Sequence, residues 1–132
     1  MLKKTITYTD YNGIERTEDF YFNISKAEVA EMELGTAGGY VEMLKRIVAA
    51  QDSPSLVKIF KEFLLKAYGV KSDDGKRFIK SDELSTAFSQ TEAYVNLYME
   101  LATDADAASV FMNGVFPTPN AVAQPGNNAS AT

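Results

Sequence analysis

An Asn12-Gly13 pair between two runs of alternating apolar and polar residues is the feature that most constrains the fold. In that setting the pair is the strongest local signal for a β-hairpin. A two-residue turn would scatter the apolar side chains over both faces, because side chains alternate along a strand. A three-residue loop over 11–13, with Gly13 in the left-handed conformation, pairs Asp10 with Ile14 instead. The apolar residues that this register places on one face are Leu2, Ile6, Tyr8, Ile14, Phe20 and Phe22.

The segment after the hairpin carries clear signals for the start of a helix. Residues 25–28 read Ser-Lys-Ala-Glu, which is a capping box, and Ile24 and Val29 occupy the two positions of a hydrophobic staple. Gly35 is placed to end this helix. The spacing of apolar residues then predicts a second helix over about 40–51.

A third helix is predicted after the second, with Ser53 as its cap, Pro54 at its first position and Gly69 at its end. A polar loop over 71–76 follows, with a turn at 73–75. Helical spacing returns over 93–101.

A final short helix is predicted to end near Gly114, and either Thr103 or Asp104 can cap it. Together, these signals predict a fold of the α+β class, with an N-terminal β-hairpin packed on a bundle of five or six short α-helices. Residues 1–116 are expected to form a single domain. Residues 117–132 hold three prolines and no charged residue, so a disordered C-terminal tail is expected there.

The stretch DGKRFIKSDELSTAFSQTE, residues 74–92, is dense in hydroxyls and carboxylates and so raises the question of an active site. Its carboxylates Asp82 and Glu83 are adjacent, so on a helix they point about 100° apart and do not face each other. Ser81 fits a helix cap, with both acids favourably placed in the first turn. Ser89 repeats the capping-box spacing with Glu92. The stretch is therefore predicted to hold two successive helix starts and no catalytic residue.

The amino-acid composition excludes several kinds of functional site. The chain has no Cys and no His, which removes thiolate nucleophiles and the commonest zinc ligands. The residues from Ser72 to Glu83 only partly match a calcium loop, so no metal site and no cofactor is predicted. The net charge of −5, with no run of basic residues longer than a pair, argues against nucleic-acid binding. No apolar run approaches the roughly 20 residues that span a bilayer. Protein binding is the function that survives.

Aromatic residues are the best candidates for such binding. Seven Tyr and eight Phe are more than a small core easily hides, and Tyr is favoured at protein contacts. For any single aromatic residue, core packing is the plainer interpretation. The candidate partner-binding residues are Tyr94, Tyr98, Phe111 and Phe116.

Five strings point to a known family: KTITYTDYNGIERTEDFYFN, ISKAEVAEMEL, RIVAAQDSPSLVKIFKEFLLKAYG, DGKRFIKSDELSTAFSQTEAY and YMELATDADAASVFMNG. Together they resemble phage tail assembly chaperones, small proteins encoded in the tail-assembly regions of tailed bacteriophages and prophages. The resemblance covers roughly residues 3–116. It implies a non-catalytic protein that binds the tape measure protein, the tail tube protein or both during tail morphogenesis. It also implies a place in the host bacterial cytoplasm and absence from the mature virion.

Two alternative functions are also considered for this chain. The chain could be a minor virion structural protein, such as a tail or head–tail joining component. A small metal-dependent or acid/base enzyme is the third and weakest alternative, since nothing in the sequence places a nucleophile beside a base. Self-association is left open.

Overall fold

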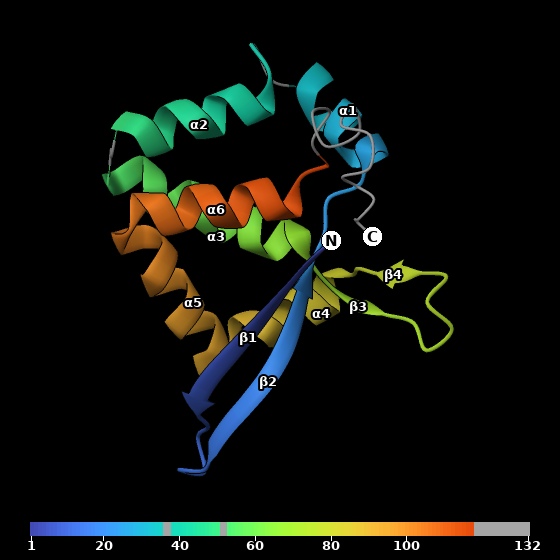
Figure 1. Ribbon diagram of the computed structural model, residues 1–132, viewed down its shortest axis with the longest axis vertical. Coiled ribbons are helices and arrows are strands. Elements are labelled where there is room, and N and C mark those ends of the chain that lie inside the picture. Colours follow the sequence, from blue (N-terminus) through green and yellow to red (C-terminus); the bar gives the residue numbers. More distant parts are fainter. Residues whose placement is uncertain (36–37, 51–52, 118–132) are drawn as a thin grey trace, which may run out of the picture.

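The computed structural model describes residues 1–35, 38–50 and 53–117 of the 132-residue chain. It contains one four-stranded antiparallel sheet, in which the strands lie in chain order (Figure 1). The strands are β1 (Leu2–Thr9), β2 (Glu15–Phe22), β3 (Tyr68–Lys71) and β4 (Phe78–Ile79). The six helices of the described residues are α1 (Lys26–Leu34), α2 (Tyr40–Ala50), α3 (Ser53–Ala67), α4 (Asp82–Ser89), α5 (Glu92–Thr103) and α6 (Ala105–Val115). The predicted α+β class is confirmed.

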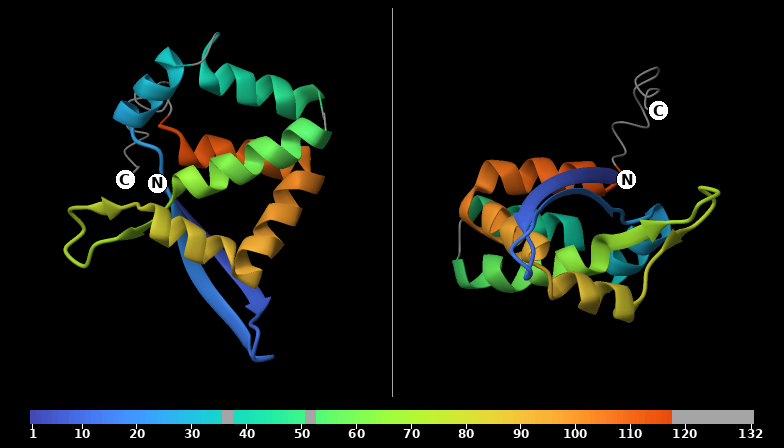
Figure 2. Two further views of the ribbon diagram at one scale, coloured as in Figure 1. Left: turned by 180° about the vertical axis from the view of Figure 1, so that it is seen from behind. Right: turned by 90° about the horizontal axis from the view of Figure 1, so that it is seen from below.

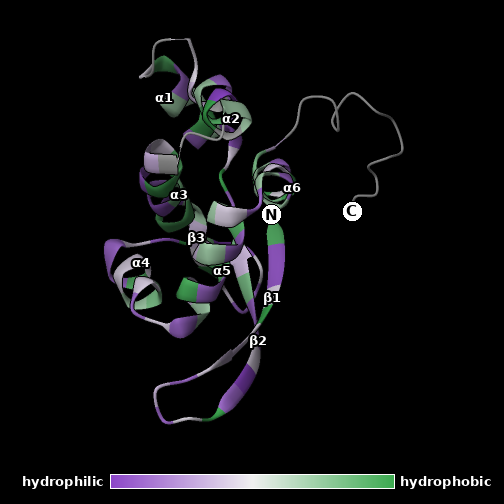
Figure 3. Ribbon diagram, turned by 90° about the vertical axis from the view of Figure 1, so that its left-hand side faces the viewer, coloured by the Kyte–Doolittle hydropathy of each residue, from purple (hydrophilic) through white to green (hydrophobic). Residues whose placement is uncertain are grey.

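The register of the first hairpin is the predicted one. The Asp10 amide donates to the Ile14 carbonyl at 2.8 Å, and Gly13 has a φ of 81°. Ile6 and Phe22 are buried, as the predicted apolar face requires. Ile14 is the exception and stays exposed, because the tip of the hairpin extends past the helices (Figures 1 and 3).

A second hairpin, formed by β3 and β4, was not predicted. The sequence favoured a helix as far as Gly69 followed by a loop, whereas α3 ends at Ala67 and Gly69 already pairs with Tyr21 of β2. Strands of four and two residues are too short to show an alternating pattern, and their pairing with a distant strand leaves no local signal. The turn predicted at 73–75 is confirmed, with Gly75 at a φ of 75°.

The capping predictions for α1 and α4 are confirmed. Ser25 and Glu28 form the reciprocal capping box of α1, and the Ser81 hydroxyl accepts from the Leu84 amide at the start of α4. Gly35 is the C-cap of α1, although its φ of −88° is right-handed. Ser53, predicted as a cap, is instead the first residue of α3, and the residue before it lies outside the described part of the chain.

The cap predicted at Ser89 is wrong. Ser89 is the last residue of α4, where its hydroxyl donates to the Thr86 carbonyl at 2.7 Å. Thr91 caps α5 instead, because its side chain accepts from the Tyr94 amide. Of the two candidates for α6, Asp104 is the cap and accepts from two amides.

One core joins the sheet to the helices. Phe22 of β2 is fully buried, and its ring lies 5.2 Å from that of Phe111 in α6 and 5.8 Å from that of Phe88 in α4. Helix α3 contributes Phe60, Phe63 and Leu64, all fully buried. Helices α3 and α4 lie on one side of the first hairpin (Figure 2, right). A single domain over 1–116 stays a prediction, and the predicted tail lies outside the described residues except for Pro117.

Candidate protein-binding surface

The polar stretch 74–92 forms a turn and two helix starts. The Asp74 carboxylate accepts from the Lys76 amide at 3.0 Å and from the Ser72 hydroxyl at 2.7 Å. Both bonds lower the pKa of Asp74, and the bond from the Lys76 amide has the larger effect. Asp82 and Glu83 are exposed in the first turn of α4. Asp74, Ser81 and Thr91 thus fix the turn and the two helix starts through bonds to backbone amides.

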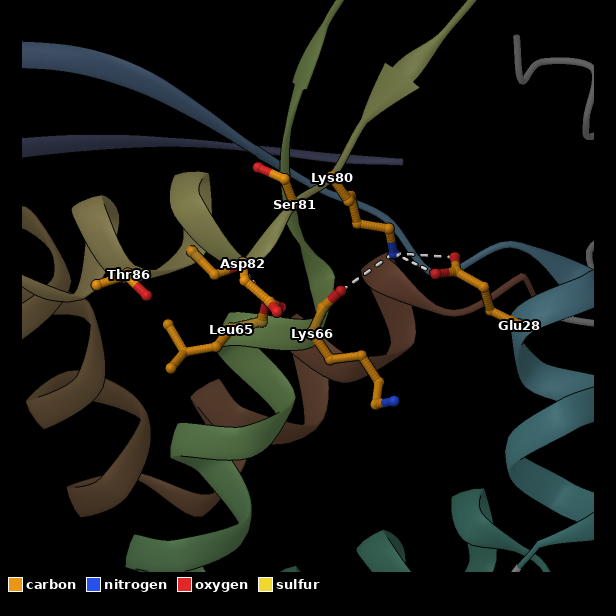
Figure 4. Close-up of a pocket in the computed structure, with 8 residues that line it drawn as sticks. Glu28, Leu65, Lys66, Lys80, Ser81, Asp82 and Thr86 are labelled. Atoms are coloured by element: carbon orange, nitrogen blue, oxygen red, sulfur yellow. Dashed lines mark hydrogen bonds and ion pairs between the residues drawn. The ribbon is translucent and has the colours of Figure 1, made fainter.

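Lys80, between β4 and α4, ties three distant segments together (Figure 4). Its ammonium group lies 2.7 Å from a Glu28 carboxylate oxygen and donates to the carbonyls of Asn23 and Lys66 at 2.8 and 3.1 Å. Glu28 also accepts from the Ser25 amide at 2.8 Å, so one carboxylate serves both the capping box and the ion pair. The junction of α1, α3 and the sheet therefore depends on Lys80.

Gly69 of β3 leaves room for the Phe78 ring and the Lys80 side chain to pass over the strand. A Cβ atom at Gly69 would lie 2.5 Å from the Phe78 ring and 2.9 Å from Cγ of Lys80. It would also lie 2.8 Å from the backbone oxygen of Ile79, which cannot turn away as a side chain could. Only glycine lets the Lys80 stem and the Phe78 ring cross β3 here.

An open groove of about 640 Å³ lies beside Lys80. Several of its polar groups are engaged: the Ser85 hydroxyl donates to the Leu65 carbonyl at 2.8 Å, and the Lys80 ammonium group has three oxygen partners. Its lining residues are Glu28, Leu65, Lys66, Lys80, Ser81, Asp82, Ser85 and Thr86. We interpret the groove as a structural junction.

Three of the four aromatic residues predicted to bind a partner lie in the core. Tyr94, Phe111 and Phe116 are buried, with Phe111 against Phe22 and Phe116 against Phe63 at ring distances of 5.2 and 5.3 Å. Tyr98 is half-buried. A contact of these four rings with a partner stays a prediction, and only Tyr98 offers an accessible ring in this conformation.

An exposed apolar ridge flanks Tyr98. The Tyr98 hydroxyl of α5 donates to the Val57 carbonyl of α3 at 2.9 Å, which brings the two helices side by side. Val57, Val95 and Met99 are 51%, 40% and 52% exposed. Val95 and Met99 lie one turn apart on α5. We call Val57, Val95, Tyr98 and Met99 the α3–α5 ridge.

The ridge was missed because sequence reasoning weighed aromatic residues and passed over Val95 and Met99. Their apolar side chains on the side of α5 away from the buried stripe, where polar residues are the rule, are a signal that could have found them. Aliphatic, Met and Tyr side chains together suit an adaptable contact with another protein.

No group of three or more Asp, Glu, His or Cys side chains in the described residues is placed to hold a metal ion. Within the same ranges, no helix is both long and apolar enough to cross a membrane.

Comparison with known proteins identifies a family. The chain matches no curated protein and no solved structure. A family model described as phage tail assembly chaperone matches residues 1–124, which is most of the 132-residue chain. The chain therefore belongs to the phage tail assembly chaperone family.

Proposed function

We propose that this chain is a non-catalytic chaperone that binds the tape measure protein, the tail tube protein or both during phage tail morphogenesis. The observation that carries this proposal is the family match over residues 1–124. The site chemistry agrees, because the side chains of Lys80, Glu28 and Ser85 in the groove are engaged in bonds that hold the fold together. Binding, with no bond made or broken, is the activity that remains for the exposed side chains.

We further propose that the α3–α5 ridge contacts the client. Two helices supply it, and both are anchored in the core by buried residues such as Phe60 and Leu97. A ridge on rigid elements can hold a client without first being ordered. The partner that fits is an amphipathic helix whose apolar residues recur at three- and four-residue spacing. Charged residues of the client would stay in solvent beside the ridge.

The proposed place of action is the host cytoplasm, before the tail is complete. A chaperone of this kind should leave the assembly and be absent from mature particles. A minor tail or head–tail joining protein should stay. Mass spectrometry of purified virions separates the two: peptides of this chain at a stoichiometric level would contradict the chaperone role.

The direct test is co-expression with the tape measure protein of the same phage. We expect that protein to be soluble only when this chain is present, and to be captured with it. A tape measure protein that is equally soluble without this chain would contradict the proposal. A parallel capture with the tail tube protein alone shows which of the two clients is bound.

A further inference from the structure

Two exposed lysines border the α3–α5 ridge on its α3 side. Lys61 lies one helical turn after Val57, and Lys58 lies one turn before Lys61, so that Lys61 comes between Val57 and Lys58 around the helix. The Val57 carbonyl, which accepts from the Tyr98 hydroxyl at 2.9 Å, is also the helical partner of the Lys61 amide. The ridge therefore meets α3 at the turn that carries Lys61.

The charges of both lysines are available to a partner. Among the described residues, neither Lys58 nor Lys61 takes part in an ion pair. The acidic residue of α3, Glu62, lies beyond Lys58 and near α2: burial, and after it the charge of Glu62, raises the pKa of Tyr40 to about 12. The flank of α3 that adjoins the ridge is therefore basic.

The opposite flank of the ridge is formed by a row of polar residues on α5 that reaches the first hairpin. Glu92 accepts from the Tyr11 hydroxyl at 3.1 Å, and Glu100, two turns later on the same side, pairs with Lys4 at 3.2 Å. Around α5, the two exposed apolar residues of the ridge lie between this row and Tyr98. The ridge thus has α3 on one side and this row on the other.

This second flank carries negative charge. Lys4 neutralises Glu100, whereas Glu92 keeps its charge because its partner is a hydroxyl group. Residues 81–132, which include α4, α5 and α6, contain no Lys or Arg, so these helices add no positive charge beside Glu92. The two flanks of the ridge therefore differ in sign, with Lys58 and Lys61 on one and Glu92 on the other.

We propose that the client helix carries acidic residues along one side of its apolar stripe, and that these residues face Lys58 and Lys61. This inference rests on the proposed contact between the ridge and the client. In the reverse direction the same helix would bring its acidic side to Glu92, where like charges repel. The two flanks therefore fix the direction in which the client helix lies. A nucleic acid would meet the same repulsion, and the net charge of −5 disfavours it.

The test uses synthetic amphipathic peptides of about 20 residues, long enough to hold a helix. Two peptides share one leucine stripe and have Glu or Gln along one side of it, with Gln along the other side of both. In fluorescence anisotropy at low salt, we expect the Glu peptide to bind about fivefold more tightly than the Gln peptide, because it gains two exposed ion pairs. The difference should vanish at about 1 M salt, where charges are screened over about 3 Å.

Charge-reversed variants locate the effect. Lys58→Glu with Lys61→Glu should reverse the preference, so that the Gln peptide binds more tightly than the Glu peptide. Lys45→Glu with Arg46→Glu on α2 makes the same change in net charge and should keep the wild-type preference. Circular dichroism confirms that each variant is folded, and binding of the Gln peptide shows that the ridge is intact.

The direction of the helix has its own measurement. A nitroxide label at the N-terminus of the Glu peptide should broaden the NMR signals at one end of α5. In a third peptide the Glu residues lie on the other side of the leucine stripe, and its label should broaden signals at the opposite end. Labels that broaden the same end for both peptides would overturn the inference.

The failure of this inference can be told from the failure of the ridge contact. Peptide binding that Val95→Asp with Met99→Asp abolishes, but that is equal for the Glu and Gln peptides, would overturn the role of the lysines alone. Binding of neither peptide would overturn the ridge contact as well, while capture of the tape measure protein tests the chaperone role separately. An oligothymidine that displaces the Glu peptide, or a wild-type dimer that the α5 double variant cannot form in sedimentation, would overturn the inference and identify the other occupant.

Discussion

Helices α1 and α5 are held in place by different kinds of interaction. Helix α5 buries four side chains in the core, which are Ala93, Tyr94, Leu97 and Leu101. Helix α1 buries none, and its Leu34 is 91% exposed. Its anchors are a capping box, the ion pair of Glu28 with Lys80, and the partly buried side chains of Val29 and Met32. The comparison teaches that α5 depends on fully buried side chains, whereas α1 depends on partly buried ones and a few polar bonds, so substitutions should affect the two helices differently.

The largest effect is expected from Phe22→Ala. Phe22 is fully buried among the rings of Tyr68, Phe88 and Phe111, so its removal leaves a cavity in the core on which α5 depends. We expect the free energy of unfolding to fall by about 3–5 kcal/mol in urea titrations. Leu34→Ala on α1 is the control and should stay within about 0.5 kcal/mol of the wild type. Equal losses would refute the contrast between the two helices.

Gly69→Ala should come next, because it acts at the junction between the two regions. The added Cβ would meet the Ile79 backbone oxygen and the Phe78 ring, so β4 and Lys80 must shift. We expect a loss of about 1–3 kcal/mol, typical of overpacking. Gly35→Ala, where the nearest atom to the new Cβ is 3.5 Å away, is the matched control. If both substitutions had the same small effect in thermal unfolding, the crossing at Gly69 would not be tight.

Helix caps give a smaller effect. Ser81→Ala and Thr91→Ala each remove an acceptor for a backbone amide and should cost about 1 kcal/mol. Ser89→Ala should cost less, because the Ser89 hydroxyl donates within α4 and caps no helix. The three variants can be compared by denaturant midpoint. A larger loss of stability for Ser89→Ala than for Thr91→Ala would indicate that Ser89, as first predicted, caps α5.

The smallest expected effect is a pH dependence of α1 that comes from Glu28. Burial raises the pKa of Glu28, but the hydrogen bonds from Lys80 and from the Ser25 amide outweigh it, so the pKa lies below its ordinary value of 4.5. A lowered pKa adds stability that is present above the unfolded value and is lost as the pH falls through the folded one. In an NMR titration, the signal of the Ser25 amide, which donates to the Glu28 carboxylate, should therefore change at a midpoint below 4.5. Glu28→Gln should abolish this midpoint, and its persistence in that variant would assign it to another group.

The parts of the fold that were predicted are those with local signals. The Asn12-Gly13 pair gave the hairpin register, and the spacing of Ser25 and Glu28 gave the start of α1. Both depend on residues within a few positions of one another. Helix α1 was therefore predictable even though it buries no side chain.

The parts that were not predicted depend on distant contacts. Strand β3 exists because Tyr68 and Gly69 meet β2, and Thr91 replaces Ser89 as a cap because α4 continues through Ser89. For the candidate site, only Tyr98 was named among the residues of the α3–α5 ridge. Helical spacing over 93–101 gives the buried side of α5, whereas the contact of Tyr98 with Val57 follows from the packing of α5 against α3.

Capture of the tape measure protein by ridge variants tests the central claim most directly. Val95→Asp combined with Met99→Asp places charges on the exposed flank of α5, whereas Leu34→Asp places one on the most exposed large apolar residue of α1. With all chains folded by circular dichroism, we predict that the α5 double variant no longer captures the client and that Leu34→Asp captures it as the wild type does. Undiminished capture by the α5 double variant would contradict the account.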